Sequence, residues 1–89
     1  MHEEALLRDL VRKIGEVARA HRAERVTRVR LWVGAFAHLS PPQLRERWRT
    51  AAAGTPAERA ELDIEFSHDT SDPRATGIVL VSVDAEPPR

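Results

Sequence analysis

The sequence predicts an α+β domain in which a three-stranded mixed sheet carries two helices packed on one face. Three observations support this fold class: the chain is short, its apolar residues change from a helical to an alternating period, and the elements follow the order α-β-α-β-β. With 89 residues the chain can bury one modest core, so residues 1–89 should form a single domain. A strand–helix–strand unit favours parallel pairing through a right-handed crossover.

The first helix is expected over residues 4–21. Its apolar residues recur at intervals of three and four, which is typical of a helix with one buried stripe; they are Leu6, Leu7, Leu10, Val11, Ile14, Val17 and Ala18. Acidic residues lie four positions before basic ones, as Asp9 does before Lys13, and such pairs stabilise the solvent-exposed side of a helix.

A strand and a second helix follow. Residues 29–33 alternate apolar and polar side chains before Gly34, which predicts a half-buried strand. Ser40 suits the N-cap of the next helix and Gln43 completes a capping box. Pro41 suits the first helical position, and Gly54 suits the left-handed residue that ends the helix.

Two further strands complete the domain. Residues 62–66 alternate again, and a polar linker over residues 68–77 leads to a third strand over residues 78–83. This last strand is apolar on both faces apart from Ser82, which predicts a central rather than an edge position. The linker suits an antiparallel pair between the last two strands.

Composition excludes several classes of protein. The chain has no cysteine, so disulfides, thiolate zinc sites and cysteine nucleophiles are excluded. Fourteen basic residues balance fourteen acidic ones, which argues against nucleic-acid binding. No apolar run is long enough for a membrane, and the first residues do not resemble a secretory signal, so we expect a cytoplasmic protein. No catalytic arrangement or phosphate-binding loop is present, and we expect no enzyme activity.

The amino-terminal tripeptide Met1-His2-Glu3 is the candidate metal site. The α-amino group of Met1 and the backbone nitrogen of His2 can close a five-membered chelate ring, and the imidazole of His2 closes a six-membered one. Such closely spaced nitrogen donors suit square-planar or tetragonal Ni(II) and Cu(II). Glu3 could add a carboxylate or a further backbone nitrogen. The alternative is a solvated terminus that binds no metal.

Several segments in order resemble the HypA/HybF hydrogenase maturation family. They are Met1-His2-Glu3 before an amphipathic helix, residues 26–35 (VTRVRLWVGA), Pro41-Pro42-Gln43-Leu44, Gly54-Thr55, residues 60–65 (AELDIE) and residues 77–84 (GIVLVSVD). The resemblance implies that Met1, His2 and Glu3 bind nickel(II) for delivery to [NiFe] hydrogenase. It also implies a GTPase maturation partner and the hydrogenase large subunit as partners.

The family carries a zinc domain with paired Cys-x-x-Cys motifs between its second and third strands, and here a short loop near residues 67–77 takes that place. We therefore expect nickel but no zinc. The alternative function is a non-metal adaptor or subunit that keeps the fold after losing its zinc domain. The sequence leaves the oligomeric state open, with a homodimer as one alternative.

The remaining histidines and the two tryptophans have simpler interpretations. His21 should lie in the last turn of the first helix, where positive charge is favourable. His38 and His68 should lie in loops, and His68 could supply an extra metal ligand. Trp48 is expected in the core, whereas Trp32, on the arginine-bearing face of its strand, is the better candidate for an interface.

Overall fold

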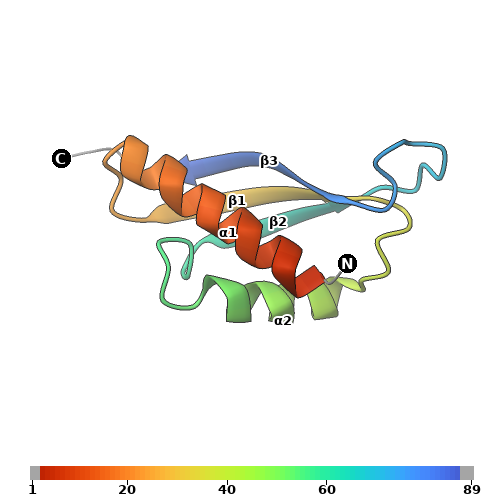
Figure 1. Ribbon diagram of the computed structural model, residues 1–89, viewed down its shortest axis with the longest axis horizontal. Helices are drawn as coiled ribbons and strands as arrows, with labels where there is room; N and C mark the ends of the chain where they lie inside the picture. Colours follow the sequence, from red (N-terminus) through yellow and green to blue (C-terminus); the bar gives the residue numbers. More distant parts are fainter. Residues whose placement is uncertain (1–2, 87–89) are drawn as a thin grey trace.

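A computed structural model describes residues 3–86 of the chain. It contains, in order, helix α1 (Glu3–Ala20), strand β1 (Val26–Val33), helix α2 (Pro41–Ala52), strand β2 (Glu61–Phe66) and strand β3 (Ile78–Ala85). The strands run lengthwise through the molecule and α1 crosses in front of them (Figure 1). This confirms the predicted α+β class and the element order.

The sheet has the order β2-β1-β3, so β1 is the central strand. β1 pairs in parallel with β2, from Arg28 opposite Glu61 to Val33 opposite Phe66, as the strand–helix–strand unit predicts. β3 pairs antiparallel with the other side of β1, and the register shifts between Arg30 and Leu31.

Two expectations about β3 are therefore wrong. β3 is an edge strand, and it does not pair with β2, because the two strands lie on opposite sides of β1. Burial explains the order: the inward residues Val29, Leu31 and Val33 of β1 are at most 1% exposed, whereas Val81 of β3 is 60% exposed. The central strand β1 is therefore the one whose inward side chains are most completely buried. The apolar sequence of β3 did not reveal that it lies at the edge.

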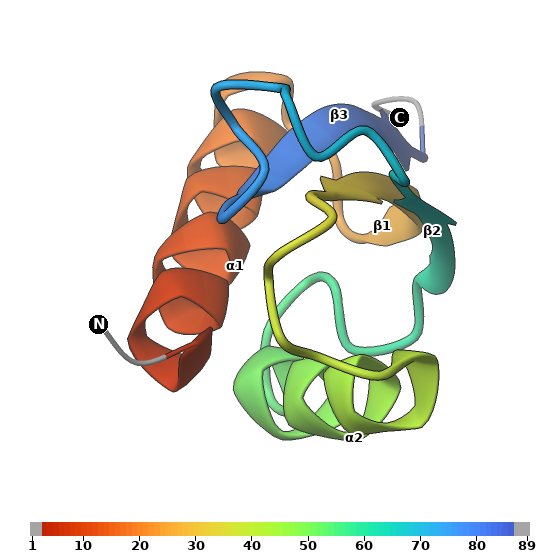
Figure 2. The same cartoon turned by 90° about the vertical axis from the view of Figure 1, so that its right-hand side faces the viewer.

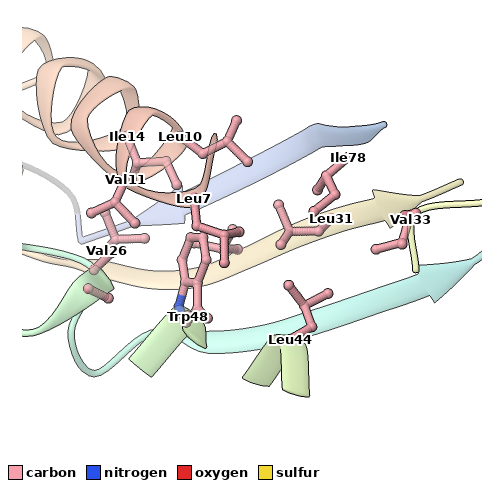
Figure 3. Packing of buried hydrophobic residues seen from close by; sticks show 14 of the residues in the cluster. Leu7, Leu10, Val11, Ile14, Val26, Leu31, Val33, Leu44, Trp48 and Ile78 are labelled. Carbon is pink, nitrogen blue, oxygen red and sulfur yellow. The ribbon is translucent and has the colours of Figure 1, made fainter. Parts of the chain in front are cut away.

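Both helices lie on one face of the sheet, and neither covers the opposite face, called the uncovered face below (Figure 2). Side chains from α1, α2 and the sheet meet in one core (Figure 3). The largest fully buried ones are Leu7, Ile14, Val26, Val29, Leu31, Val33 and Leu44. Burying each such side chain stabilises the fold by roughly 1.5–3 kcal/mol relative to leaving it in water.

The local signals for α2 act as expected. The hydroxyl of Ser40 accepts a hydrogen bond from the Gln43 N–H at 3.3 Å, and the Gln43 side chain accepts one from the Ser40 N–H at 3.1 Å. Gly54 has a φ of 77°, the left-handed conformation expected just after the helix. Trp48 is 5% exposed, which confirms its place in the core.

The loop from Ser67 to Gly77 joins β2 to β3 and is anchored to the end of β1. The Gly34 N–H donates to the Gly77 carbonyl at 2.9 Å, and the Phe36 N–H donates to the Ala75 carbonyl at 2.7 Å. Ala75 is 5% exposed. The loop therefore packs against the end of the sheet at which β1 finishes.

Candidate metal centre

The candidate ligands Met1 and His2 lie outside the described residues, and so does the side chain of Glu3. The backbone of Glu3 begins α1, so the tripeptide leads directly into that helix. What the structure adds is the surface at which the tripeptide meets the folded domain.

Helix α1 is held in place by its apolar stripe. Leu7, Leu10, Val11, Ile14 and Ala18 are all buried, with exposures from 0 to 8%. On its solvated side, Arg12 pairs with Asp9 and with Glu16, the latter at 2.9 Å. The hydrogen bond from Arg12 lowers the pKa of the Asp9 carboxyl. The apolar stripe therefore holds the start of α1 in the same core as α2, through Leu7 of α1 and Leu44 of α2.

A cleft of about 600 Å³ opens between the first turns of α1 and one side of α2. Its lining residues carry two acidic and two basic side chains, and they are Glu4, Arg8, Gln43, Glu46, Arg47, Thr50 and Ala51. Glu4 directly follows the candidate tripeptide, so the cleft borders the point where that segment enters the helix. No local sequence pattern indicates this cleft, because it forms where α1 and α2, which are separated by about 20 residues in the chain, pack together.

The other histidines do not assemble into a second metal centre. His21 lies in the turn just after α1, His38 lies in the β1–α2 loop with a φ of 57°, and His68 lies in the loop after β2. All three are exposed. Within residues 3–86 no three or more histidine, aspartate or glutamate side chains are grouped so that they could hold a metal ion.

Trp32 lies on the uncovered face of the sheet, as its position in the strand predicted. The guanidinium of Arg74 stacks over its ring at 4.7 Å from the centroid. The Asp72 carboxylate holds Arg74 there: it pairs with the guanidinium at 3.2 Å and accepts a hydrogen bond from the Arg74 backbone N–H at 2.7 Å, and these bonds lower the pKa of Asp72. The Asp72–Arg74 pair was missed in the sequence, although the spacing Asp-x-Arg in a turn-rich loop is a weak signal for it.

The arginines of β1 face acidic residues of β2. Arg28 bonds Glu61 at 2.8 Å and Asp63 at 3.3 Å, and Arg30 lies 3.7 Å from Asp63. These pairs neutralise the strip of positive charge that could have suggested a nucleic-acid surface.

None of the helices described in residues 3–86 combines the length and the apolar character needed to cross a bilayer.

Comparison with known proteins places residues 1–72 in a family model described as "Hydrogenase/urease nickel incorporation, metallochaperone, hypA". The chain is 43% identical over 66 residues to the hydrogenase maturation factor HypA of Methanopyrus kandleri, covering 74% of this chain and 46% of that protein. It is 43% identical over 65 residues to HypA of Chlorobium limicola, covering 73% of this chain and 56% of that protein. The chain thus spans about half the length of these curated relatives.

Two solved structures share the fold. The solution structure of the nickel metallochaperone HypA from Helicobacter pylori superposes with a TM-score of 0.80 at 16% identity, over 98% of this chain and 99% of that one. A second solution structure of a HypA protein gives a TM-score of 0.75 at 16% identity, over 97% of both chains. The family model, the curated relatives and the fold agree, and the chain belongs to the HypA family of hydrogenase and urease nickel-incorporation proteins.

Proposed function

We propose that this chain binds one nickel(II) ion through Met1, His2 and Glu3 and carries it as cargo for the maturation of a [NiFe] hydrogenase. The observation that carries the proposal is the position of His2 directly after the terminal residue, inside the segment that matches the nickel-incorporation family. Glu4, the residue after the tripeptide, lines the open cleft between α1 and α2, and this surface is where we propose that a recipient protein meets the ion.

The donor set explains a preference for nickel-like ions. Two adjacent chelate rings from one backbone segment place an amine, a peptide nitrogen and an imidazole in nearly one plane, which suits tetragonal Ni(II). The Glu3 carboxylate could add a further ligand or stabilise the complex. Cu(II) should bind more tightly at the same nitrogens, because affinities of divalent ions rise to copper, so selectivity for nickel would arise at the handover.

Nickel titration of untagged protein tests this site. We expect a stoichiometry of about one ion per chain, and loss of that binding in His2→Ala, because the imidazole closes one of the two rings. The matched control is His21→Ala, which removes an exposed imidazole beyond the other end of α1 and should leave binding unchanged. Equal binding by His2→Ala and the native chain would place the ion elsewhere.

Delivery of nickel needs a GTPase and a recipient enzyme in addition to this chain. We propose that a GTPase maturation protein and the hydrogenase large subunit interact with it in the cytoplasm, and that the chain itself catalyses no reaction. All charged side chains of residues 4–86 lie at the surface, so the interior offers no polar site for catalysis. A transfer assay with nickel-loaded chain, GTPase partner and apo-hydrogenase tests this role, and transfer that does not depend on the chain would contradict it.

A specific observation favours a second candidate function, a non-metal adaptor. The chain has no cysteine, and the Ser67–Gly77 loop, anchored to β1, takes the place at which the family carries its zinc domain. An adaptor would bind the maturation partners equally well with His2→Ala as with the native tripeptide. A nickel carrier would lose metal-dependent complexes in that variant.

A further inference from the structure

A basic groove lies between the middle of α1 and the segment that follows α2 (Figure 1). Its volume is about 430 Å³, and it shares only Arg8 and Ala51 with the cleft at the first turns of α1. The charged residues that line the groove are all basic, namely Arg8, Arg12 and Arg19. In the cleft, by contrast, two acidic side chains accompany the two basic ones. The basic groove therefore presents only positive charge to an occupant.

Two of the three arginines in the basic groove lack a carboxylate partner. Arg12 pairs with Asp9 and with Glu16, which lie on the solvated side of α1. Among the side chains described for residues 4–86, neither Arg8 nor Arg19 pairs with a carboxylate. These two arginines lie about 16 Å apart along the axis of α1, at a rise of about 1.5 Å per residue. An unpaired guanidinium is therefore available at each end of the groove.

Gly15 lines the basic groove between these two arginines, and the packing of the fold does not require it. Glycine is the least favourable residue in a helix interior after proline. Beyond the backbone of its own helix, a methyl group at Gly15 would meet only the guanidinium of Arg19, at an ordinary 3.8 Å. A glycine that weakens the helix without easing its packing indicates that another chain approaches the helix backbone closely at this point.

The remaining surface of the groove is mostly apolar and open. Val11 and Pro56 contribute apolar atoms. On the opposite side, Gly54 has no atom within 4 Å of the position at which a side chain would begin. An extended chain advances about 3.3 Å per residue, so the distance between the two unpaired arginines corresponds to about five residues. Acidic residues at that spacing, with small apolar residues between them, match the groove in charge and in length.

We propose that the basic groove binds an extended acidic segment of a partner protein. One carboxylate of the segment pairs with Arg8 and another with Arg19, and the chain between them runs over Gly15. Carboxylates suit this position because they accept paired hydrogen bonds from a guanidinium. A single small anion reaches only one of the two arginines, so the groove is matched to a chain. This interaction needs no nickel and is independent of the metal site proposed above.

Titration of a fluorescein-labelled peptide with the full chain tests the groove. The probe carries two glutamates at each end and four alternating valine and alanine residues between them. Its fluorescence anisotropy should rise to saturation, and the affinity should fall with added salt, which screens exposed charges. Arg19→Gln should weaken binding about fivefold. The matched control is Arg49→Gln, which removes the same charge from an exposed residue of α2 outside the groove and should leave binding unchanged.

Gly15→Leu separates binding from folding. Leucine is a better helix former than glycine, so the melting temperature should rise by a few degrees. The new side chain enters the groove, so peptide binding should weaken about tenfold or more. A peptide with glutamine in place of each glutamate should not bind. The proposal would be overturned by an absence of saturable binding, by equal weakening in both arginine variants, by unchanged binding in Gly15→Leu, or by inorganic triphosphate displacing the probe as readily as unlabelled peptide does.

Discussion

In the proposed site, His2 forms chelate rings through its place next to the amine of Met1. The imidazole alone is a common and unselective ligand, whereas the amine, peptide nitrogen and imidazole together form two fused rings. The chemistry therefore belongs to a position in the chain as much as to a residue type.

A one-residue extension separates these two contributions. Adding a glycine before Met1 converts the amine into a peptide nitrogen and moves His2 out of the position that closes both rings. We expect nickel affinity to fall at least about tenfold while His2 remains, as measured by titration across pH ~6–8, where imidazole and amine lose their protons. Unchanged affinity would show that the imidazole binds without the amine.

Gly34 is a second residue whose identity matters for a local reason. A methyl group at this position would overlap the backbone carbonyls of Arg74 and Ala75, which cannot move without displacing the loop. We expect Gly34→Ala to lower the free energy of unfolding by about 1–3 kcal/mol in urea denaturation. Gly77→Ala is the control, since its added carbon would meet only the Arg74 carbonyl at an ordinary 3.5 Å. An equal loss in both variants would contradict the steric explanation.

Among the elements, the Ser67–Gly77 loop is the one that sequence periodicity described least. Its turn residues predicted a loop, but they did not indicate that it returns to the sheet. Asp69 accepts from the Ser71 N–H at 2.9 Å and Asp72 fixes Arg74 over Trp32, so short polar contacts give the loop one conformation. A cation–π contact at the protein surface of this kind contributes about 0.5–1 kcal/mol.

The loop should respond to acid. Bonds from Arg74 lower the pKa of Asp72 below its ordinary 3.8, so the folded state favours the carboxylate. The stabilisation is complete well above pH 3.8 and is lost as the pH falls through the lowered value. We expect the Trp32 indole N–H signal in NMR spectra to shift only in that acid range, and Asp72→Asn to show the shifted signal at neutral pH. A Trp32 signal that is insensitive to both changes would argue against the stack.

The molecule as a whole is held together by one apolar core. Among the side chains described, those of residues 4–86, no polar or charged one is buried, and no buried side-chain nitrogen or oxygen lacks a hydrogen bond. Folding of this half of the family's architecture thus relies on hydrophobic packing between the sheet and two helices.

Stability should accordingly be independent of zinc. The chain has no thiolate, and its four histidines offer no four-ligand structural site of the usual kind. We expect EDTA to leave the melting temperature of the protein unchanged in a thermal scan. A decrease of several degrees would reveal a structural metal and would contradict this prediction.

The sequence by itself determined the helices, the caps of α2 and the existence of each strand, and it predicts the chelating donors of the amino terminus. These features depend on residues close together in the chain: the period of apolar side chains in α1, the Ser40–Gln43 capping box, and the donors of Met1 and His2. The family resemblance was also visible at this level, because its motifs recur in order along the chain.

The tertiary structure decided which distant segments meet. It placed β3 at the edge, Arg74 over Trp32 and the α1–α2 cleft beside the amino terminus. An apolar run shows that a strand avoids water, but it does not show whether the neighbour that excludes the water is a strand, a loop or another molecule. Strand order and surface contacts therefore depend on the competition between all arrangements of the elements, which only the packed molecule resolves.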